Sequence, residues 1–309
     1  MTSRRHERWL CWIGIAAVAC AIPAFAKSPP SLASEDTPAR AQVEQVIQQA
    51  HADVSVAFRS LDGAQELFIK ADEAFPAAPA VIQIPVMIEL YTEAQAGEVR
   101  LTDTVVVRNT FHSVIDGAVY HLDPKTDSDQ DLYKELGKPI TLQDLCEHMV
   151  ARNSSLAADL LIERLGLDRV RQRIESLHAN GIQVIHAIEP DRPNDKRPDN
   201  STTTRAMLEL LWTLAKGQDA GDDSSKQMVG MLARAAFQQP PTAGMPSDPR
   251  ATQSVRLAGI GQQAMIEFGP HPFIVVILIR GVTNPEASAE LMALIEHALA
   301  AGLDANIGS

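Results

Sequence analysis

The segment at residues 74–91, AFPAAPAVIQIPVMIELY, is where reactive groups would be most useful. A proline among small residues leads into an apolar run with helical spacing, which predicts a sharp turn into a buried helix. The first turn of such a helix offers free N–H groups and the positive end of the helix dipole. Yet Ala80 and Gln83 stand where a nucleophile or a base would be useful. The segment has the position for catalysis without the reactive groups.

Other stretches offer little alternative chemistry. Residues 121–138 hold five acids, but counting from Asp127 puts Leu132 at position six and Lys138 at position twelve, where a calcium loop needs Gly and Glu. We therefore expect a solvated loop. The histidines are scattered without zinc-binding spacing, and no G-x-S-x-G, Walker or dinucleotide fingerprint occurs. No metal and no cofactor are expected.

Residues 1–26 have the three parts of a secretory signal peptide. Three arginines precede a short apolar stretch, which ends in Ala24-Phe25-Ala26. We predict cleavage after Ala26 and export by the Sec route, to the periplasm or the medium. Twin-arginine export through Arg4-Arg5, lipid attachment at Cys20 and a membrane anchor remain open alternatives.

Composition narrows the classes of partner. The chain carries a formal net charge of −12 at pH 7 and becomes more acidic without residues 1–26, which hold three arginines and one glutamate. Nucleic acids and anionic membrane surfaces need basic patches, so neither is an expected partner. Cys146 is the one cysteine that remains after cleavage, and its helical setting predicts a small buried hydrophobe.

The rest of the chain is predicted to form one domain at 41–303, after a flexible Pro/Ser-rich leader at 27–40. Alternating apolar residues at 54–72 surround an Asp-Gly pair, and those at 263–282 surround a Gly-Pro pair. Each pattern predicts a β-hairpin. A helical pattern precedes the first hairpin and another follows the second.

The region between the hairpins is predicted to be helical. Amphipathic patterns indicate helices at 141–150, 154–166, 167–181 and 205–217, and a polar stretch with three prolines at 189–204 must be a surface loop. The arrangement predicts an α+β fold, in which an antiparallel sheet carries packed helices and an all-helical lobe is inserted between its strands.

Five stretches together resemble the class A β-lactamase-like serine hydrolases, a branch of the penicillin-recognising fold. In the family's order and spacing they lie at 74–91, 110–124, 148–166, 188–211 and 269–282. The resemblance implies a β-lactamase/transpeptidase-like fold: a five-stranded antiparallel sheet flanked by the terminal helices, an all-helical lobe and a substrate cleft between them. It also implies serine acylation as the family's chemistry.

The family's Ser-x-x-Lys pair falls on Ala80 and Gln83. No shift of the alignment restores it, because residues 61–112 contain no serine and residues 71–124 contain no lysine. Without a hydroxyl group, no acyl-enzyme can form by this route. Gln83 hydrogen-bonds without a buried charge and Ala80 is a good helix former, so we expect a stable, chemically quiet cleft.

The second element, usually Ser-x-Asn, aligns with Asn153-Ser154-Ser155, where the serine and the asparagine have changed places. The resemblance makes Ser154 and Ser155 candidate ligand contacts in the cleft. An equally weighted alternative is that one of these three residues caps the following helix.

The third element, Lys-Thr-Gly, falls near Gln253-Ser254-Val255 or one residue later. No lysine follows Lys226, so the cation that would hold a substrate carboxylate is missing. Arg250 or Arg256 could supply positive charge there. Ser254 is a further candidate ligand contact.

One part of the family's machinery is kept. Glu189-Pro190 matches the acidic residue and proline of the loop that activates the deacylating water. Glu189 is therefore either a positioned base and ligand contact or a solvated side chain of a polar loop.

Two functional hypotheses follow. The first is an exported protein that has lost acyl-serine hydrolase activity and binds a β-lactam-like molecule, a peptidoglycan fragment or a protein partner. The second is an active hydrolase that opens a β-lactam ring with Ser154, Ser155 or a water activated by Glu189.

Overall fold

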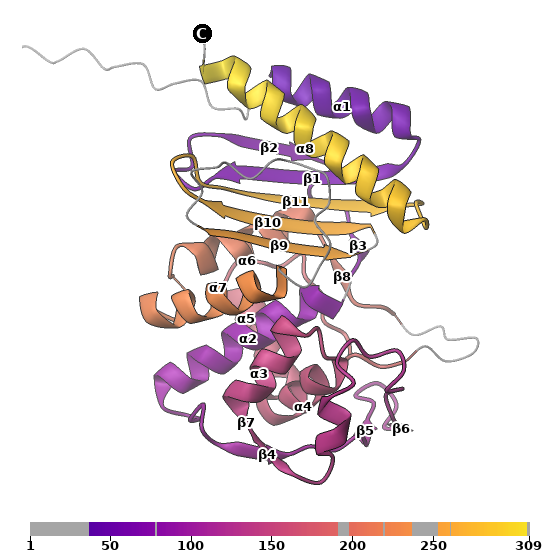
Figure 1. The fold of residues 1–309 in the computed structure, drawn as a ribbon, viewed down its shortest axis with the longest axis vertical. Coiled ribbons are helices and arrows are strands. Elements are labelled where there is room, and N and C mark those ends of the chain that lie inside the picture. The colour runs from indigo at the N-terminus through magenta and orange to yellow at the C-terminus, as the bar shows by residue number, and fades with distance from the viewer. Residues whose placement is uncertain are drawn as a thin grey trace, which may run out of the picture. The chain divides into compact units, whose positions relative to one another are not determined.

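Five antiparallel strands form the central sheet, in the order β2-β1-β11-β10-β9 (Figure 1). The strands are β1 (Asp53–Ser60), β2 (Glu66–Ile69), β9 (Gln253–Gly259), β10 (Gln262–Phe268) and β11 (Phe273–Arg280). Both predicted hairpins are present: β1 pairs with β2, and β10 pairs with β11. Because β1 also pairs with β11 along its full length, the two ends of the chain close into one sheet.

The central strand β11 is apolar on both faces because both faces of the sheet are covered. Val275 and Ile277 pack on one side with α1 and α8, while Ile274 and Val276 pack on the other side with the rest of the helices. This alternation follows from the two-residue period of a strand. The sheet therefore separates two hydrophobic cores.

The terminal helices α1 (Pro38–Ala50) and α8 (Pro285–Ile307) lie together on one face of the sheet (Figure 1). The leader was predicted to extend to residue 40, but α1 begins at Pro38. Thr37 ends the leader there because its side chain accepts a hydrogen bond from the backbone N–H of Arg40 and caps the helix.

The opposite face of the sheet meets α6 (Thr204–Ala215) and α7 (Asp222–Ala236), which contact β11 and β9 respectively. The sequence patterns indicated α6 but assigned no helix to α7. A buried stripe that includes Met228, Val229 and Leu232 holds α7 against the lobe, and two aspartates occupy its first turn.

Beyond these helices lies the helical lobe (Figure 1). Its helices are α2 (Pro79–Ala96), η1 (Leu132–Glu135), α3 (Leu142–Ala151), α4 (Ser155–Leu165) and α5 (Leu167–Ser176). Short two-stranded pairs tie its connections: β3 (Phe75–Pro76) with β8 (Ser201–Thr202), β4 (Thr104–Val106) with β7 (Pro139–Thr141), and β5 (Phe111–His112) with β6 (Val119–Tyr120). The predicted fold class is confirmed.

The computed structural model describes residues 37–77, 79–190, 198–218, 220–236, 253–259 and 261–307, without the side chains at 79, 80, 236, 253, 254, 256, 258 and 303–307. The predicted signal peptide, most of the leader and Arg250 lie outside this part of the chain. Among the described helices, none combines the length and apolar character needed to cross a membrane.

Candidate functional site

The head of α2 is built as the sequence predicted. Pro79 is the first residue of the helix, where its missing N–H costs nothing, and Ala80 follows it in the first turn. Gln83 comes one turn later, and only 3% of its surface is exposed. A buried amide must find a hydrogen-bond partner, and the Nε2 of Gln83 donates to the Oδ1 of Asn153 at 3.0 Å.

Asn153 connects this helix to the rest of the site. Its backbone has φ 54°, in the left-handed region that asparagine tolerates better than most residues, and this turn separates α3 from α4. Its Nδ2 donates to the hydroxyl of Ser128 at 3.4 Å. The altered positions of the first and second elements, Gln83 and Asn153, are therefore in direct contact through neutral amides.

The two serines after Asn153 serve the start of α4. Ser154 is fully buried, and its Oγ accepts a hydrogen bond from the backbone N–H of Ala157 at 3.3 Å, which makes it the N-cap. The alternative of a helix cap therefore holds for Ser154, while its contact with a ligand stays a prediction. Ser155 is the first residue of α4 and is partly exposed.

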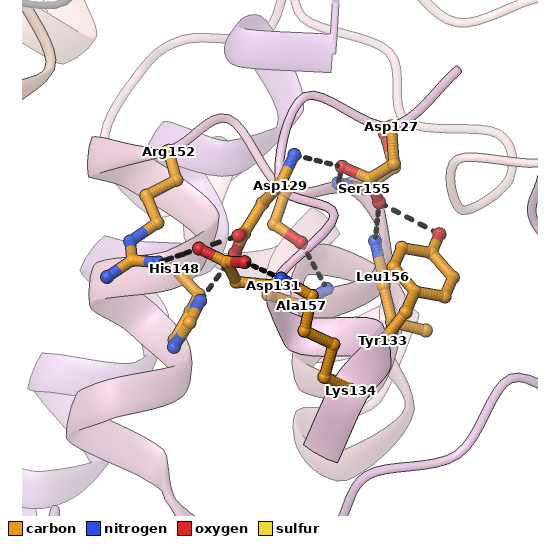
Figure 2. Close-up of polar contacts among 11 residues, drawn as sticks. Asp127, Asp129, Asp131, Tyr133, Lys134, His148, Arg152, Ser155, Leu156 and Ala157 are labelled. Atoms are coloured by element: carbon orange, nitrogen blue, oxygen red, sulfur yellow. Dashed lines mark hydrogen bonds and ion pairs between the residues drawn. The ribbon is translucent and has the colours of Figure 1, made fainter. Parts of the chain in front are cut away.

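Asp127 completes the start of α4 from a distant segment (Figure 2). Its carboxylate accepts hydrogen bonds from the backbone N–H groups of Ser155 at 3.2 Å and Leu156 at 2.9 Å, and from the hydroxyl of Tyr133 at 3.0 Å. Negative charge at a helix N-terminus is stabilised by the free N–H groups and the helix dipole. Asp127 thus fills the anion-binding position that precedes this helix.

The acidic stretch is solvated over most of its length, as predicted, but not at two of its five acids. Asp127 and Asp129 are both buried. The carboxylate of Asp129 is hydrogen-bonded to the Nδ1 of His148 (Figure 2). The guanidinium of Arg152 lies 3.6 Å from the carboxylate of Asp129 and 3.6 Å from that of Asp131. The acids are thereby matched by basic side chains and helix N–H groups. Among the described residues, no group of three or more His, Cys, Asp or Glu is placed to hold a metal ion.

Glu189 lies on a short segment, residues 186–190, that is fixed from two sides. Asn200 accepts hydrogen bonds from the backbone N–H of Ile185 at 2.6 Å and that of His186 at 3.1 Å. On the other side, Asp159 of α4 accepts one from the backbone N–H of Ile188 at 2.7 Å. Glu189 itself is partly buried. The segment is ordered at this point, so Glu189 occupies a defined place beside α4.

Asp159 is a site residue that sequence reasoning missed. Only 1% of its surface is exposed, and besides Ile188 it accepts a hydrogen bond from the hydroxyl of Tyr120 at 2.9 Å. Burial raises the pKa of Asp159, and so do the nearby carboxylates of Glu189 and Asp127, while its two hydrogen-bond donors lower it; the net result is a pKa of about 8. The available signal was an acid within the apolar run SLAADLLIERL.

The third element, which aligns with the family's Lys-Thr-Gly, lies in β9. The structure describes the backbone of this strand and the side chains of Val255 and Leu257. In β9, Ser254 pairs with Glu267 and Val255 pairs with Ile266. Val255 is buried in the core that faces the helical lobe. The side chains of Ser254 and Arg256 lie outside the described residues, so the predicted contacts of these two residues stay predictions.

Cys146 behaves as predicted. It is fully buried in α3, and burial raises the pKa of its thiol above the ordinary value. A buried, protonated thiol is a poor nucleophile and packs as a small apolar side chain.

The chain belongs to the β-lactamase enzyme family, whose model matches residues 38–301. Similar solved structures include a β-lactamase from Sphaerobacter thermophilus, at 22% identity and a TM-score of 0.67, covering 87% of this chain and 98% of that one. A β-lactamase from Xanthomonas campestris pv. campestris matches at 16% identity and a TM-score of 0.68, covering 86% and 97%.

A variant of PBP-A, solved as an acyl-enzyme complex with penicillin G, matches at 17% identity and a TM-score of 0.69, covering 90% of this chain and 99% of that one. At these identities the structural likeness establishes the fold alone. Comparison with curated proteins finds no match.

Proposed function

We propose that this chain is an exported member of the β-lactamase family that does not form an acyl-enzyme and that binds a small ligand in its cleft. The ligand class that we propose is a β-lactam-like molecule or a peptidoglycan fragment. Docking of a protein partner is the other outcome that the tests below distinguish.

The hydrogen bond between Gln83 and Asn153 carries this proposal. In the family pattern these positions hold a lysine and a serine, which can exchange a proton. Here an amide N–H donates to an amide oxygen at 3.0 Å, and neither group titrates in the physiological range. Together with the alanine at position 80, this pair leaves no nucleophile and no base at the head of α2.

The competing hydrolase hypothesis needs a substitute nucleophile. Ser154 is unsuited, because its hydroxyl is buried and bonded within the helix cap. Ser155 is partly exposed, but among the described contacts no histidine or lysine lies against its hydroxyl as an activating base. The hydrolase hypothesis is then left with one mechanism, in which Glu189 activates a water molecule that attacks the substrate directly, without a covalent intermediate.

A turnover assay separates the two hypotheses. The purified mature chain is incubated with a chromogenic cephalosporin beside three variants, Glu189→Gln, Ser155→Ala and Ser154→Ala. We expect no turnover above buffer for any of the four proteins. Turnover by the parent chain that disappears in Glu189→Gln or Ser155→Ala would overturn the proposal and would identify the residue responsible.

A thermal-shift experiment tests ligand binding separately. Penicillin or purified muropeptides are added over a concentration series, and binding to the folded state raises the Tm with increasing ligand. We expect a saturable rise with at least one of them while the ligand stays chemically unchanged. No shift with any ligand would exclude the small-ligand role and leave protein docking.

Export is tested by the mature N-terminus. We expect N-terminal sequencing of the chain from a periplasmic or secreted fraction to begin at Lys27. Recovery of the whole chain with Met1 in the cytoplasm would contradict it.

A further inference from the structure

A row of neutral polar side chains runs from the head of α2 to the acidic stretch. The Nε2 of Gln83 donates to the Oδ1 of Asn153 at 3.0 Å, and the Nδ2 of Asn153 donates to the Oγ of Ser128 at 3.4 Å. Gln83 is buried, whereas Asn153 and Ser128 are exposed. The buried end of this row therefore holds in place an exposed end that a ligand can reach.

The carboxamide of Asn153 has hydrogen-bonding capacity left for a ligand. A carboxamide can donate two hydrogen bonds and accept two, and the contacts described for Asn153 use one of each. The remaining N–H and lone pair are the complement of another amide group. Ser128 adds a hydroxyl group, which can donate as well as accept. The exposed end of the row can thus form several hydrogen bonds with a neutral amide.

We propose that Gln83, Asn153 and Ser128, called here the amide row, bind an uncharged amide group of the ligand and disfavour a free carboxylate. An N-acetyl group of a glycan and the backbone of a short peptide both supply such an amide. This inference rests on the proposed binding of a small ligand and selects between its two classes. A neutral part of a peptidoglycan fragment is bound in preference to the carboxylate of a β-lactam.

Negative charge beside the amide row opposes an anionic ligand. Ser128 lies between Asp127 and Asp129 in the chain, and both of these acids are buried. The N–H groups of Ser155 and Leu156 at the start of α4 could receive an anion, but they already donate to Asp127 (Figure 2). A ligand carboxylate would therefore meet like charge at a helix start that is already occupied.

The positive charge beside the amide row is also engaged. Arg152 directly precedes Asn153 in the chain. Its guanidinium lies 3.6 Å from the carboxylate of Asp129 and 3.6 Å from that of Asp131. On the α2 side, the neutral Gln83 stands where the family pattern has its lysine. Neither neighbour therefore offers a ligand carboxylate a cation of its own.

A matched pair of probes tests the preference for a neutral ligand. An N-acetylated dipeptide of D-alanine and its C-terminal amide differ by one carboxylate, and NMR titration of the mature chain measures the Kd of each. We expect the amide to bind at least about tenfold more tightly than the acid, because the acid brings a charge beside Asp127 and Asp129. A neutral tetramer of N-acetylglucosamine is titrated in parallel to test a glycan as the source of the amide.

Three variants test whether the amide row makes the contact. Asn153→Asp keeps the acceptor for Gln83 and suits the left-handed backbone, but it removes a donor and adds a charge. The affinity for the neutral probe should fall at least about tenfold. Ser128→Ala should weaken binding several-fold while the Tm of the free protein stays unchanged. Asn180→Asp, the same change at an exposed asparagine beyond α5, is the control and should leave the affinity unchanged.

The outcomes separate this inference from the proposed function. Equal or tighter binding of the acid overturns the inference and leaves the proposed ligand binding intact. An equal loss of affinity in Asn153→Asp and Asn180→Asp overturns it too. If neither the dipeptide amide nor the tetramer binds, the inference is also wrong, whereas the proposed ligand binding fails only if penicillin and muropeptides leave the Tm unchanged as well.

Discussion

Gln83 illustrates how a single side chain can change the chemistry at the head of a helix while it stays packed and hydrogen-bonded. A lysine at this position would be buried and would need a compensating charge, whereas the glutamine is satisfied by one hydrogen bond to Asn153. The exchange removes the proton carrier and keeps a polar link between α2 and the turn before α4. The proposed loss of acyl transfer and the retention of structure therefore have the same cause.

The first prediction at this scale concerns stability. Gln83→Lys should lower the free energy of unfolding by roughly 2–4 kcal/mol, because it buries a charge without an acidic partner among the residues described around it. Gln83→Met, which keeps the size and leaves the Oδ1 of Asn153 unpaired, should cost about 1–2 kcal/mol. Urea denaturation of the three proteins at pH 7 measures both values. Equal stability of Gln83→Lys and the parent chain would refute the argument.

The second prediction concerns activity. Ala80→Ser combined with Gln83→Lys should leave turnover at least about 100-fold below that of an active β-lactamase of this fold, since Asn153 still lacks a hydroxyl and no lysine follows Lys226. A chromogenic cephalosporin assay at matched enzyme concentrations measures it. Efficient hydrolysis by the double variant would mean that these two losses matter little.

At the scale of elements, the start of α4 is formed by residues from two places in the chain. Ser154 caps it locally, and Asp127 reaches it from 28 residues away. The sequence offered both possibilities for Ser154, but it could not reveal Asp127, because a cap supplied by a distant loop leaves no local pattern. The short β-pairs and α7 were missed for a related reason: their residues acquire order only through tertiary contacts.

The contribution of Asp127 can be measured against a neighbour. Asp127→Ala should destabilise the chain by about 2–3 kcal/mol, because it removes a cap and leaves the Tyr133 hydroxyl and three backbone N–H groups without their acceptor. Asp131→Ala, on the exposed side of the same stretch, should change stability by less than about 1 kcal/mol. Equal effects in denaturant titrations would contradict the capping role.

A pair of glycines tests the packing of helices. Gly302 of α8 faces α1 so closely that an added Cβ would collide with the backbone of Ala39, whereas Gly230 of α7 would meet only the tip of Arg234 at 3.6 Å. Gly302→Ala should therefore destabilise the chain although alanine favours helices, and Gly230→Ala should stabilise it by about 0.5–1 kcal/mol. Thermal unfolding of both variants decides this, and a gain in Tm for Gly302→Ala would refute close packing of α1 on α8.

At the scale of the whole molecule, the buried carboxyl of Asp159 makes stability depend on pH. Its pKa is raised in the folded state to about 8, while in the unfolded state an aspartate titrates near 3.9. Between these values the folded chain holds a proton that the unfolded chain has released. The stabilising contribution is thus complete below about pH 4 and is lost as pH rises through 8.

Asp159→Asn should remove this dependence. From pH 5 to 8 the free energy of unfolding of the parent chain should fall relative to the variant by up to about 1.4 kcal/mol per pH unit. Denaturant titrations of both proteins across this range measure the difference. Parallel curves for the two proteins would show that Asp159 is ionised throughout.

The fold as a whole was accessible from the sequence because its signals are local and repeated: two hairpin dipeptides, several amphipathic helices and five stretches in a familiar order. The site was accessible only in part. The missing serine and lysine could be read directly, but the Gln83–Asn153 contact, the burial of Asp127 and Asp159 and the place of Glu189 depend on segments far apart in the chain. Those contacts required the structure.

The central claim is that no side chain of this protein accepts an acyl group from a β-lactam. Intact-mass spectrometry of the mature chain, recorded seconds to hours after mixing with excess penicillin, tests it most directly. We predict an unchanged mass at every time point, while an active serine β-lactamase trapped under the same conditions provides the positive control. An added mass equal to that of penicillin, mapped by proteolysis to any serine, would contradict the account.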